Sequence, residues 1–293
     1  MSKLEYGSLC IAVDELKGKR HLLRLKEGGR FTAMYGFVEH SDIIEGGDGC
    51  FVNASKGPGY RFFYPTYGDY VMNIKRKAQI IYPKDTAAIL MWGDVRNGQR
   101  ILESGVGQGA LSMAILNTLG GSGELVGYEI REDFAVMSAD FIKEWHGEAE
   151  NHRIEIRDVY EGIDGEFDRI LLDLPEPWHV VKHAETGLRN GGIMMAYLPT
   201  IIQAVTHVET MKASGYFEEI ETFEFTKRPW KIDGRSVRPE MWTYNHSAFL
   251  VKGRKVSVKP EKPAKEEKPA KVEESAIEEI TETTEVIGTT EEA

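Results

Sequence analysis

The sequence has few of the features that mark secreted, membrane-spanning or metal-binding chains. Its 293 residues include two cysteines, Cys10 and Cys50, too few and too far apart for a disulfide framework or a zinc-binding motif. No apolar run approaches the roughly 18 residues of a membrane-spanning helix, and residues 1–6 lack the apolar core of a signal peptide. The His and acidic residues show no metal-ligand spacing. These absences predict a soluble, cytoplasmic protein without a metal or a membrane partner.

Positive charge is also in deficit. The chain has 36 Lys and Arg against 47 Asp and Glu, and its net charge of −11 by itself argues against a nucleic-acid partner. Residues 260–293, however, hold 11 Glu and 4 Lys with almost no large apolar content. Such a segment cannot bury enough apolar surface to offset its ordering entropy, so we expect a disordered acidic tail over 254–293. Its simplest role is a solvated terminus; the alternative is that it screens a basic surface or mimics nucleic acid.

The rest of the chain divides into two parts with different patterns of expected strands and helices. Residues 1–66 contain short apolar segments separated by glycine turns, which predicts a small N-terminal β-domain. Over 67–253 strands alternate with helices, which predicts βαβ units and a parallel sheet covered on both faces. We expect helices over 110–119, 131–145 and 200–213. Only a polar loop separates the last two strands, near 217–225 and 247–251, so they should pair antiparallel.

An aromatic stretch, 60–67, joins the two predicted parts and contains Tyr60, Phe62, Phe63, Tyr64 and Tyr67. Packing between the domains is the favoured interpretation, because aromatic side chains bury large apolar areas. Base stacking is the alternative.

A glycine-rich turn follows the strand near 100–103 and precedes the helix at 110. Glycines allow the backbone to approach a ligand, and the helix N-terminus offers free N–H groups. The spacing is G-x-G-x-G, which differs from the dinucleotide-binding fingerprint. The predicted cofactor-binding residues of this turn are Glu103, Ser104, Gly105, Val106, Gly107, Gln108, Gly109 and Ala110.

Acidic residues also follow the next two strands. Glu129 ends the second strand and can accept both ribose hydroxyls of an adenosine ligand, and Asp158 follows the third and can accept from an adenine amino group. Each alone could be a solvated carboxylate. Because ligands bind at the carboxyl ends of parallel strands, these residues should converge with Glu103, and together they predict a site for S-adenosylmethionine.

The fourth strand ends in Asp173-Leu174-Pro175-Glu176-Pro177-Trp178. Its prolines stiffen the loop and should fix a carboxylate and an indole in the cleft. The loop is similar to the Asp/Asn-Pro-Pro-aromatic loop of methyltransferases that modify amino nitrogens of bases. This resemblance implies that a carboxylate accepting from the exocyclic amine of adenine would orient the ring and stabilise positive charge during methylation at N1. Asp173 could equally cap the next helix, which is compatible with that role.

Two basic clusters resolve the apparent conflict between net charge and nucleic acid. Clustered cations neutralise phosphates and an interleaved tryptophan can stack on a base, although a solvated loop would look the same. The predicted RNA-binding residues of these clusters are Lys75, Arg76, Lys77, Lys227, Arg228, Trp230, Lys231, Arg235 and Arg238.

Four segments together resemble a known family. Residues 81–85 (IYPKD), the Glu103–Gly109 turn, the 172–178 loop and the closing segments 237–239 and 245–250 are similar to the prokaryotic tRNA (adenine-N1)-methyltransferases that act at T-loop position 58. The resemblance spans about residues 5–253. The glycine turn is generic to class I methyltransferases, whereas the other segments are specific.

The resemblance implies a Rossmann-like class I fold, an α/β domain with a mostly parallel seven-stranded sheet whose last strand is antiparallel. It implies S-adenosylmethionine as cofactor, tRNA as substrate and a homotetramer. It makes Asp173 the residue most directly tied to catalysis, places Tyr82 beside the cofactor and target pocket, and makes Trp178 a candidate to border the base. The chain departs from the family at Asn245-His246-Ser247-Ala248, and the acidic tail has no counterpart in the family pattern.

Two other functions would explain part of this pattern. A class I methyltransferase with a protein-carboxyl or small-molecule acceptor would keep the glycine turn and Glu129 but would not need the Asp173 loop beside a basic loop. A catalytically silent RNA-binding partner would not need an intact cofactor site.

Overall fold

The computed structural model describes residues 3–75, 77–241, 243 and 245–257. Arg76 and nearly all of the predicted acidic tail therefore lie outside the described residues. Within the part of the chain that is described, no helix has the length and apolar character to cross a membrane.

The N-terminal part is a small β region with its own apolar core. Four strands form an antiparallel sheet in the order β2-β1-β6-β5, and β3 pairs with β4. Tyr60 and Phe62 of the aromatic stretch are buried in this core. Its elements are β1 (Leu9–Asp14), β2 (Arg20–Arg24), β3 (Arg30–Ala33), β4 (Gly36–Glu39), α1 (His40–Gly46), β5 (Phe51–Ala54) and β6 (Gly57–Phe63).

Tyr67, at the end of that stretch, belongs to the second core instead. It opens α2 (Tyr67–Asn73), its hydroxyl donates to the Ala110 carbonyl oxygen at 2.8 Å, and its ring meets Trp145 edge-on. The stretch thus contributes side chains to both cores, and its packing between the two parts stays a prediction. The proposed boundary between residues 66 and 67 stays a prediction.

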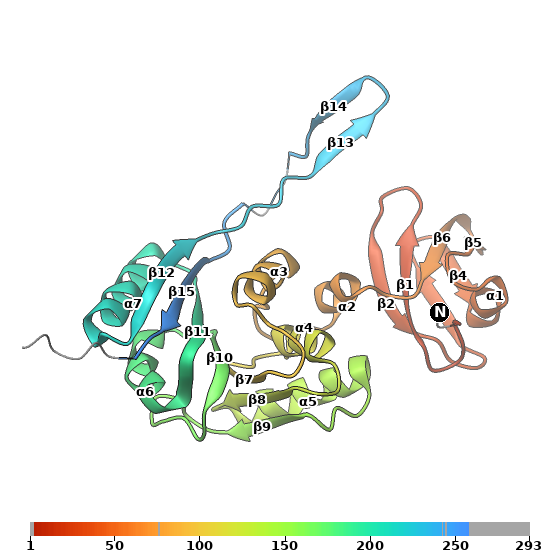
Figure 1. Cartoon of the computed structure of the whole chain (residues 1–293). Coiled ribbons are helices and arrows are strands. Elements are labelled where there is room, and N and C mark those ends of the chain that lie inside the picture. Colours follow the sequence, from red (N-terminus) through yellow and green to blue (C-terminus); the bar gives the residue numbers. More distant parts are fainter. Residues whose placement is uncertain (1–2, 76, 242, 244, 258–293) are drawn as a thin grey trace, which may run out of the picture. The chain divides into compact units, whose positions relative to one another are not determined.

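The second part contains a seven-stranded sheet in the order β12-β15-β11-β10-β7-β8-β9 (Figure 1). Neighbouring strands from β11 to β9 pair parallel, and β15 pairs antiparallel with both β11 and β12. The predicted fold class is confirmed. The strands are β7 (Arg100–Ser104), β8 (Glu124–Glu129), β9 (His152–Ile156), β10 (Phe167–Leu172), β11 (Leu188–Leu198), β12 (Phe217–Phe223) and β15 (Phe249–Lys255).

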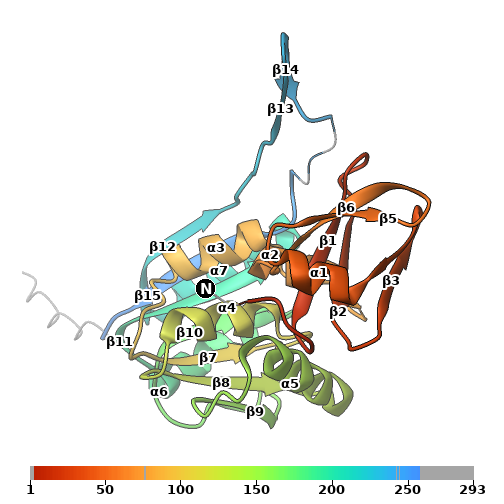
Figure 2. The same ribbon diagram turned by 90° about the vertical axis from the view of Figure 1, so that its right-hand side faces the viewer.

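Helices cover both faces of this sheet because successive strand residues point to opposite sides. Ile101 and Leu171 pack with the helices α3 (Pro83–Trp92), α4 (Ala110–Leu119) and α5 (Glu132–His146), and Leu102 and Leu172 pack on the other face with η1 (Pro177–His183), α6 (Ala184–Gly187) and α7 (Ile201–Ser214). Figures 1 and 2 both show α5 beside β8 and β9. The three predicted helices match α4, α5 and α7 within one residue at each end.

One local prediction is wrong. The polar loop expected between the last two strands contains a β-hairpin, β13 (Trp230–Asp233) paired with β14 (Ser236–Pro239). Gly234, at φ 53°, turns the chain between the two strands, a left-handed backbone that glycine adopts without strain. The signal was present in the alternation of Trp230, Ile232 and Val237 with polar residues.

The strand order places a topological switch in the middle of the sheet. From β7 the chain proceeds outward through β8 and β9 and then returns to β10 on the other side of β7. The loops after β7 and β10 therefore diverge, and open α/β sheets bind ligands in the crevice between such loops.

Candidate active site

The glycine turn and the Asp173 loop meet at this switch point. Gly105 has φ 85°, and a Cβ atom built on it would lie 2.1 Å from the Asp173 carbonyl oxygen. The Asp173 amide also donates to the Ser104 carbonyl oxygen at 2.9 Å. Glycine is therefore required at residue 105 both for its backbone conformation and for the close approach of the second loop.

Glu129 at the end of β8 orders the same turn. Its carboxylate accepts from the Gly107 amide at 3.1 Å and from the Arg131 amide at 3.0 Å, and the side chain is buried. A carboxylate oxygen has two lone pairs, so each oxygen keeps acceptor capacity for a ligand hydroxyl.

Glu103 is a buried acid at the base of the turn. Its carboxylate accepts a 2.6 Å hydrogen bond from Ser112 of α4, and only 2% of the residue is exposed. Burial is the largest cause that raises the pKa of Glu103 to about 8; the Ser112 hydrogen bond opposes the rise and the negative charges of Asp173 and Glu129 add to it. A cationic ligand group here would favour the ionised form.

Asp173, which follows the neighbouring strand β10, is also an acid whose pKa is raised by burial. Burial, with a further contribution from the Glu129 charge, raises the pKa of Asp173 to about 7. The loop that carries it is held from α7, where the Gln203 side-chain amide donates to the Pro175 carbonyl oxygen at 2.9 Å. Three acids after adjacent strands thus share one weakly solvated region.

A small cavity of about 20 Å³ opens between the turn and the loop. Its lining residues include most of the predicted cofactor set: Gln79, Ile80, Ile81, Glu103, Gly105, Val106, Gly107, Gln108, Ala110, Leu111 and Asp173.

A second, larger cleft of about 620 Å³ is lined by Tyr82, the residue that follows Ile81 in the chain. Ile81 lines the small cavity whereas Tyr82, the N-cap residue of α3, lines the cleft, so residues 81–82 form the wall between the two spaces. Both the N-terminal region, through Arg20, and the segment after β12, through Lys227 and Pro229, contribute to the cleft. The predicted catalytic pair therefore lies on the two sides of this wall.

Gln108 connects the glycine turn to the first basic cluster. Its side-chain oxygen accepts from the Lys77 and Ala78 amides, both at 3.0 Å, and its nitrogen donates to the Lys75 carbonyl oxygen at 3.3 Å. The side chain thus serves to hold residues 75–78 against the turn. Lys75 and Lys77 are both exposed beside the cofactor turn.

The second basic cluster lies on and just before the β13–β14 hairpin, where all five predicted cations are exposed. Lys231 and Arg238 are cross-strand partners and share one face. Trp230, Ile232 and Val237 lie on the opposite face, and each is more than half exposed. The hairpin therefore presents one basic face and one apolar face.

Asp158 and Trp178 are outside the described lining of both spaces, as are Ser104, Gly109 and Glu129 of the predicted cofactor set. Asp158 follows β9 as expected, but its carboxylate accepts from the Tyr160 amide at 2.8 Å, and it is absent from the described lining of the cavity. Trp178 lies in η1, with its ring centroid 5.9 Å from that of His179, and lines neither space among the described residues. Their ligand roles remain predictions.

Sequence reasoning missed several polar residues around the site. Ser112, Lys84, Asp85, Tyr197 and Ser247 all contact or neighbour the predicted groups. Lys84 and Asp85 stand in the quoted 81–85 segment and Ser247 in the quoted 245–250 segment, but these two segments are more than 150 residues apart, so spacing gave no signal of their contacts.

The sheet order, the glycine turn after the first strand and the acids after the following strands define a class I S-adenosylmethionine-dependent methyltransferase, and two similar solved structures agree with this class. The chain belongs to the family described as the tRNA methyltransferase complex GCD14 subunit, whose model matches residues 60–289. A second model, TrmI-like N-terminal, matches residues 11–52. The resemblance found in the sequence is confirmed.

Two curated relatives match over most of their length. The tRNA (adenine(57)-N(1)/adenine(58)-N(1))-methyltransferase TrmI of Methanocaldococcus jannaschii is 32% identical over 277 residues, which cover 86% of this chain and 95% of the relative. The tRNA (adenine(58)-N(1))-methyltransferase TrmI of Thermus thermophilus is 30% identical over 247 residues, covering 84% and 96%.

Two solved structures share the fold. A structure titled as a SAM-dependent O-methyltransferase from Thermotoga maritima has a TM-score of 0.83 at 30% identity and covers 88% of this chain and 96% of its own. The tRNA (m1A58) methyltransferase TrmI from Aquifex aeolicus has a TM-score of 0.77 at 25% identity and covers 87% and 100%.

Proposed function

We propose that this chain is a cytoplasmic enzyme that transfers a methyl group from S-adenosylmethionine to N1 of adenine 58 in the T-loop of tRNA, with adenine 57 as an alternative additional target. The observation that carries the proposal is the contact between Gly105 and Asp173, which joins the cofactor turn to a partly dehydrated carboxylate. The names of the relatives support the substrate and the position.

The chemistry of the small cavity fits the cofactor. Glu129 offers acceptor oxygens for the ribose hydroxyls, the backbone of Gly105 and Gly107 permits close approach, and Glu103 offers a carboxyl group to a cation. When bound, S-adenosylmethionine supplies an electrophilic methyl group on a sulfonium cation. Asp158 would accept from the adenine amino group of the cofactor.

Asp173 orients the target base. N1 of adenine already has a lone pair, so the enzyme needs to position the ring and does not need to remove a proton. The Asp173 carboxylate accepts from the exocyclic amine and stabilises the positive charge that develops on the ring during methylation at N1. Tyr82, on the cleft side of the wall, borders the base, which leaves its stack to reach the site.

The basic residues bind the RNA backbone. Lys75 and Lys77, beside the cofactor turn, and the hairpin cations contact phosphates, and Trp230 stacks on a base. The Arg228 guanidinium lies 5.7 Å from the centre of the Trp230 ring, which supports a joint cationic and aromatic surface. Trp178 of η1 borders the target base.

We also propose that the enzyme is a homotetramer. The apolar face of the hairpin supports this, because an isolated two-stranded hairpin is only marginally stable in water and gains from covering Trp230, Ile232 and Val237. Light scattering after size-exclusion chromatography should give four times the chain mass of 33.0 kDa. A monomer at working concentration would contradict the assembly without affecting the reaction.

The function is tested by incubating the enzyme with methyl-labelled S-adenosylmethionine and an unmodified tRNA transcript, followed by mass analysis of nucleosides and mapping. We expect N1-methyladenine at position 58. A transcript with guanine at 58 is the matched control, and label remaining in it identifies position 57. Cofactor binding without tRNA methylation would keep the fold and overturn the substrate.

The second candidate function is methyl transfer to an oxygen acceptor, because the Thermotoga structure is titled as an O-methyltransferase. A hydroxyl acceptor must lose its proton, and Asp173, with a pKa of about 7, could accept it. O-methylated nucleoside, or label in a small molecule in place of N1-methyladenine, would favour this candidate. Undetectable cofactor binding would favour a silent RNA-binding partner.

A further inference from the structure

Helix α3 and strand β10 run in opposite directions, and Tyr82 and Asp173 lie at the same end of this pair of elements. Tyr82 immediately precedes α3, and Asp173 immediately follows β10. The ten residues of α3 span about 15 Å. Asp173 is four residues beyond Arg169 in the chain, which corresponds to about 13 Å of extended backbone. The helix and this part of the strand are thus matched in length.

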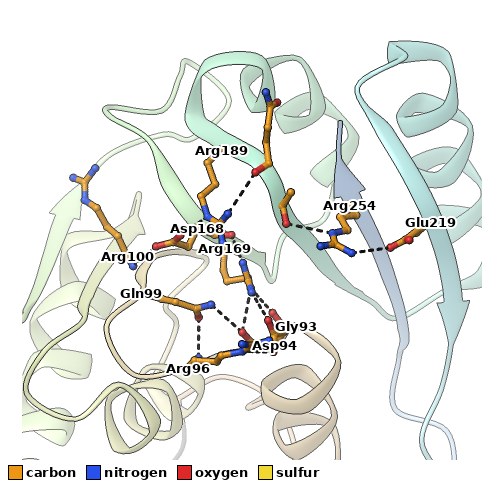
Figure 3. A network of polar contacts seen from close by, with 12 residues as sticks. Gly93, Asp94, Arg96, Gln99, Arg100, Asp168, Arg169, Arg189, Glu219 and Arg254 are labelled. Atoms are coloured by element: carbon orange, nitrogen blue, oxygen red, sulfur yellow. Dashed lines mark hydrogen bonds and ion pairs between the residues drawn. The ribbon is translucent and has the colours of Figure 1, made fainter. Parts of the chain in front are cut away.

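Arg169 joins the far end of α3 to β10 (Figure 3). Its Nε donates to the carbonyl oxygens of Gly93 at 2.6 Å and Asp94 at 3.2 Å, and its Nη2 donates to the Asp94 carboxylate at 2.6 Å. The side chain is 4% exposed, and Asp94 has a φ of 52°. A buried guanidinium needs all of these partners, since an unpaired charge there would be costly.

Lys84 joins the near end of α3 to the last strands. Its ammonium group donates to Asp85 at 2.7 Å, to the Phe225 carbonyl oxygen at 2.7 Å and to Ser247 at 2.5 Å. These contacts use all three of its donors. Asp85 is fully buried and also accepts from Ser247 at 2.6 Å.

Ser247 extends this network to β11. Its hydroxyl donates to Asp85, and the Tyr197 hydroxyl of β11 lies close enough for the two side chains to interact. Burial raises the pKa of Tyr197, and the charges of Asp85 and Asp173 raise it further, so this hydroxyl stays protonated near the Asp173 carboxylate. Lys84, Asp85, Ser247 and Tyr197 are called the Lys84 cluster below.

We propose that the Lys84 cluster and Arg169 are positioning residues that set the separation between Tyr82 and Asp173, and with it the placement of the target base between cleft and cofactor. Arg169 fixes α3 to the strand that carries Asp173, and the Lys84 cluster fixes the helix turn that carries Tyr82. This inference depends on the proposed function for its kinetic readout, but the rigidity of α3 can be measured without RNA.

The segments that the Lys84 cluster joins are also those that line the cleft. Tyr82, Pro83 and Lys84 come from the first turn of α3, Lys227 and Pro229 follow Phe225, and Thr243 precedes Ser247. A displacement of this turn therefore moves a wall of the cleft and leaves the Gly105–Gly109 turn in place. Catalysis should change more than cofactor binding does.

The test compares Ser247→Ala with Ser247→Thr, which keeps the hydroxyl. Ser247→Ala should lower kcat about tenfold or more, since a displacement of about 1 Å can cost roughly 100-fold, with cofactor Kd unchanged. Ser247→Thr should restore most of kcat. Arg169→Lys, about 13 Å from Asp173 along the strand, should lower kcat in the same way. Glu221→Gln, which removes the exposed 2.8 Å pair with Lys252 between β12 and β15, is the matched control and should behave as the wild type.

Hydrogen exchange without RNA provides the independent readout. The Asp85 and Thr86 amides both donate to the Tyr82 carbonyl oxygen at 2.9 Å and should exchange faster in Ser247→Ala. Wild-type kcat in both Ser247→Ala and Arg169→Lys would overturn the inference, as would a parallel loss of kcat, cofactor affinity and Tm. A wild type that makes no methyladenine would refute the proposed function, and the exchange result would still decide whether the cluster holds α3.

Discussion

Ser112 donates a 2.6 Å hydrogen bond to the buried carboxyl group of Glu103, at the point where α4 passes the end of β7. The bond stabilises the ionised acid, yet burial prevails and the pKa of Glu103 is raised to about 8. Glu103 is therefore mostly protonated at neutral pH in the free enzyme, and Asp173 about half protonated.

Binding of S-adenosylmethionine should release protons. A sulfonium cation favours the ionised forms of Glu103 and Asp173, so the affinity should rise with pH between about 6 and 8. Titration calorimetry at neutral pH in buffers of different ionisation enthalpy measures the released protons directly. Glu103→Gln should reduce that number, and an enthalpy independent of the buffer in the wild type would contradict the linkage.

Asp173→Asn should lower kcat about 100-fold or more, because the amide cannot supply the negative charge that stabilises the developing cation. For the wild type, kcat/KM for the cofactor should rise through about pH 7, the pKa of Asp173 in the free enzyme. The variant should lack the part of that rise due to Asp173. Asp164→Asn, an exposed acid paired with Arg157, is the control and should keep wild-type turnover. Wild-type kcat in Asp173→Asn would refute the assigned role.

Gly105→Ala should abolish cofactor binding. The added Cβ would lie 2.1 Å from the Asp173 carbonyl oxygen, so the turn and the loop must separate. Gly98→Ala is a matched control, because Gly98 has a similar φ of 82° with open space around it. Cofactor Kd measured by calorimetry should be lost in the first variant and kept in the second. Equal effects would show that backbone strain alone is responsible.

Replacing Lys231 and Arg238 together by Ala should weaken tRNA binding and reduce its salt dependence. Each lost phosphate contact lowers the slope of log K against log salt by about 0.7 to 0.9. Cofactor affinity should not change, since both residues lie on the exposed basic face of the hairpin. Lys212→Ala on α7, which removes an exposed lysine paired with Glu209, is the control. An unchanged salt slope in the double variant would exclude the hairpin from phosphate contact.

His207→Leu should stabilise the fold. His207 of α7 is fully buried and both its ring nitrogens lack a hydrogen-bond partner in the described structure. Burial lowers its pKa to about 4, so between pH 6.5 and 4 the unfolded chain binds a proton that the folded chain does not. Because the folded chain keeps His207 neutral, the free energy of unfolding is highest above about pH 6.5 and decreases as pH falls through 4. Urea unfolding should show a gain of about 1–3 kcal/mol for the variant and a weaker loss on acidification; a destabilised variant would contradict the prediction.

The alternation of strands with α4, α5 and α7 could be predicted from the sequence alone, whereas the β13–β14 hairpin and helices α1 to α3 were not expected. The Gly105–Gly109 turn, the acids Glu103, Glu129 and Asp173, and the helix over 110–119 follow from local periodicity and from chemistry that neighbouring residues share. Because parallel strands end at one edge of a sheet, their terminal acids could also be expected to converge. For Glu103, Glu129 and Asp173 the structure agrees.

Only the tertiary structure decided which polar groups face one another. Lys84 and Ser247 are separated by 163 residues, and Arg169 and Asp94 by 75. Such pairs leave no periodic signal, because the sheet order and the antiparallel return of β15 bring them together. The same reason explains why the contacts of the Gln108 side chain with residues 75–78 could not be predicted from the sequence. The sequence determined the elements and the residue types at their ends, and the packing of distant segments determined their separations and pKa values.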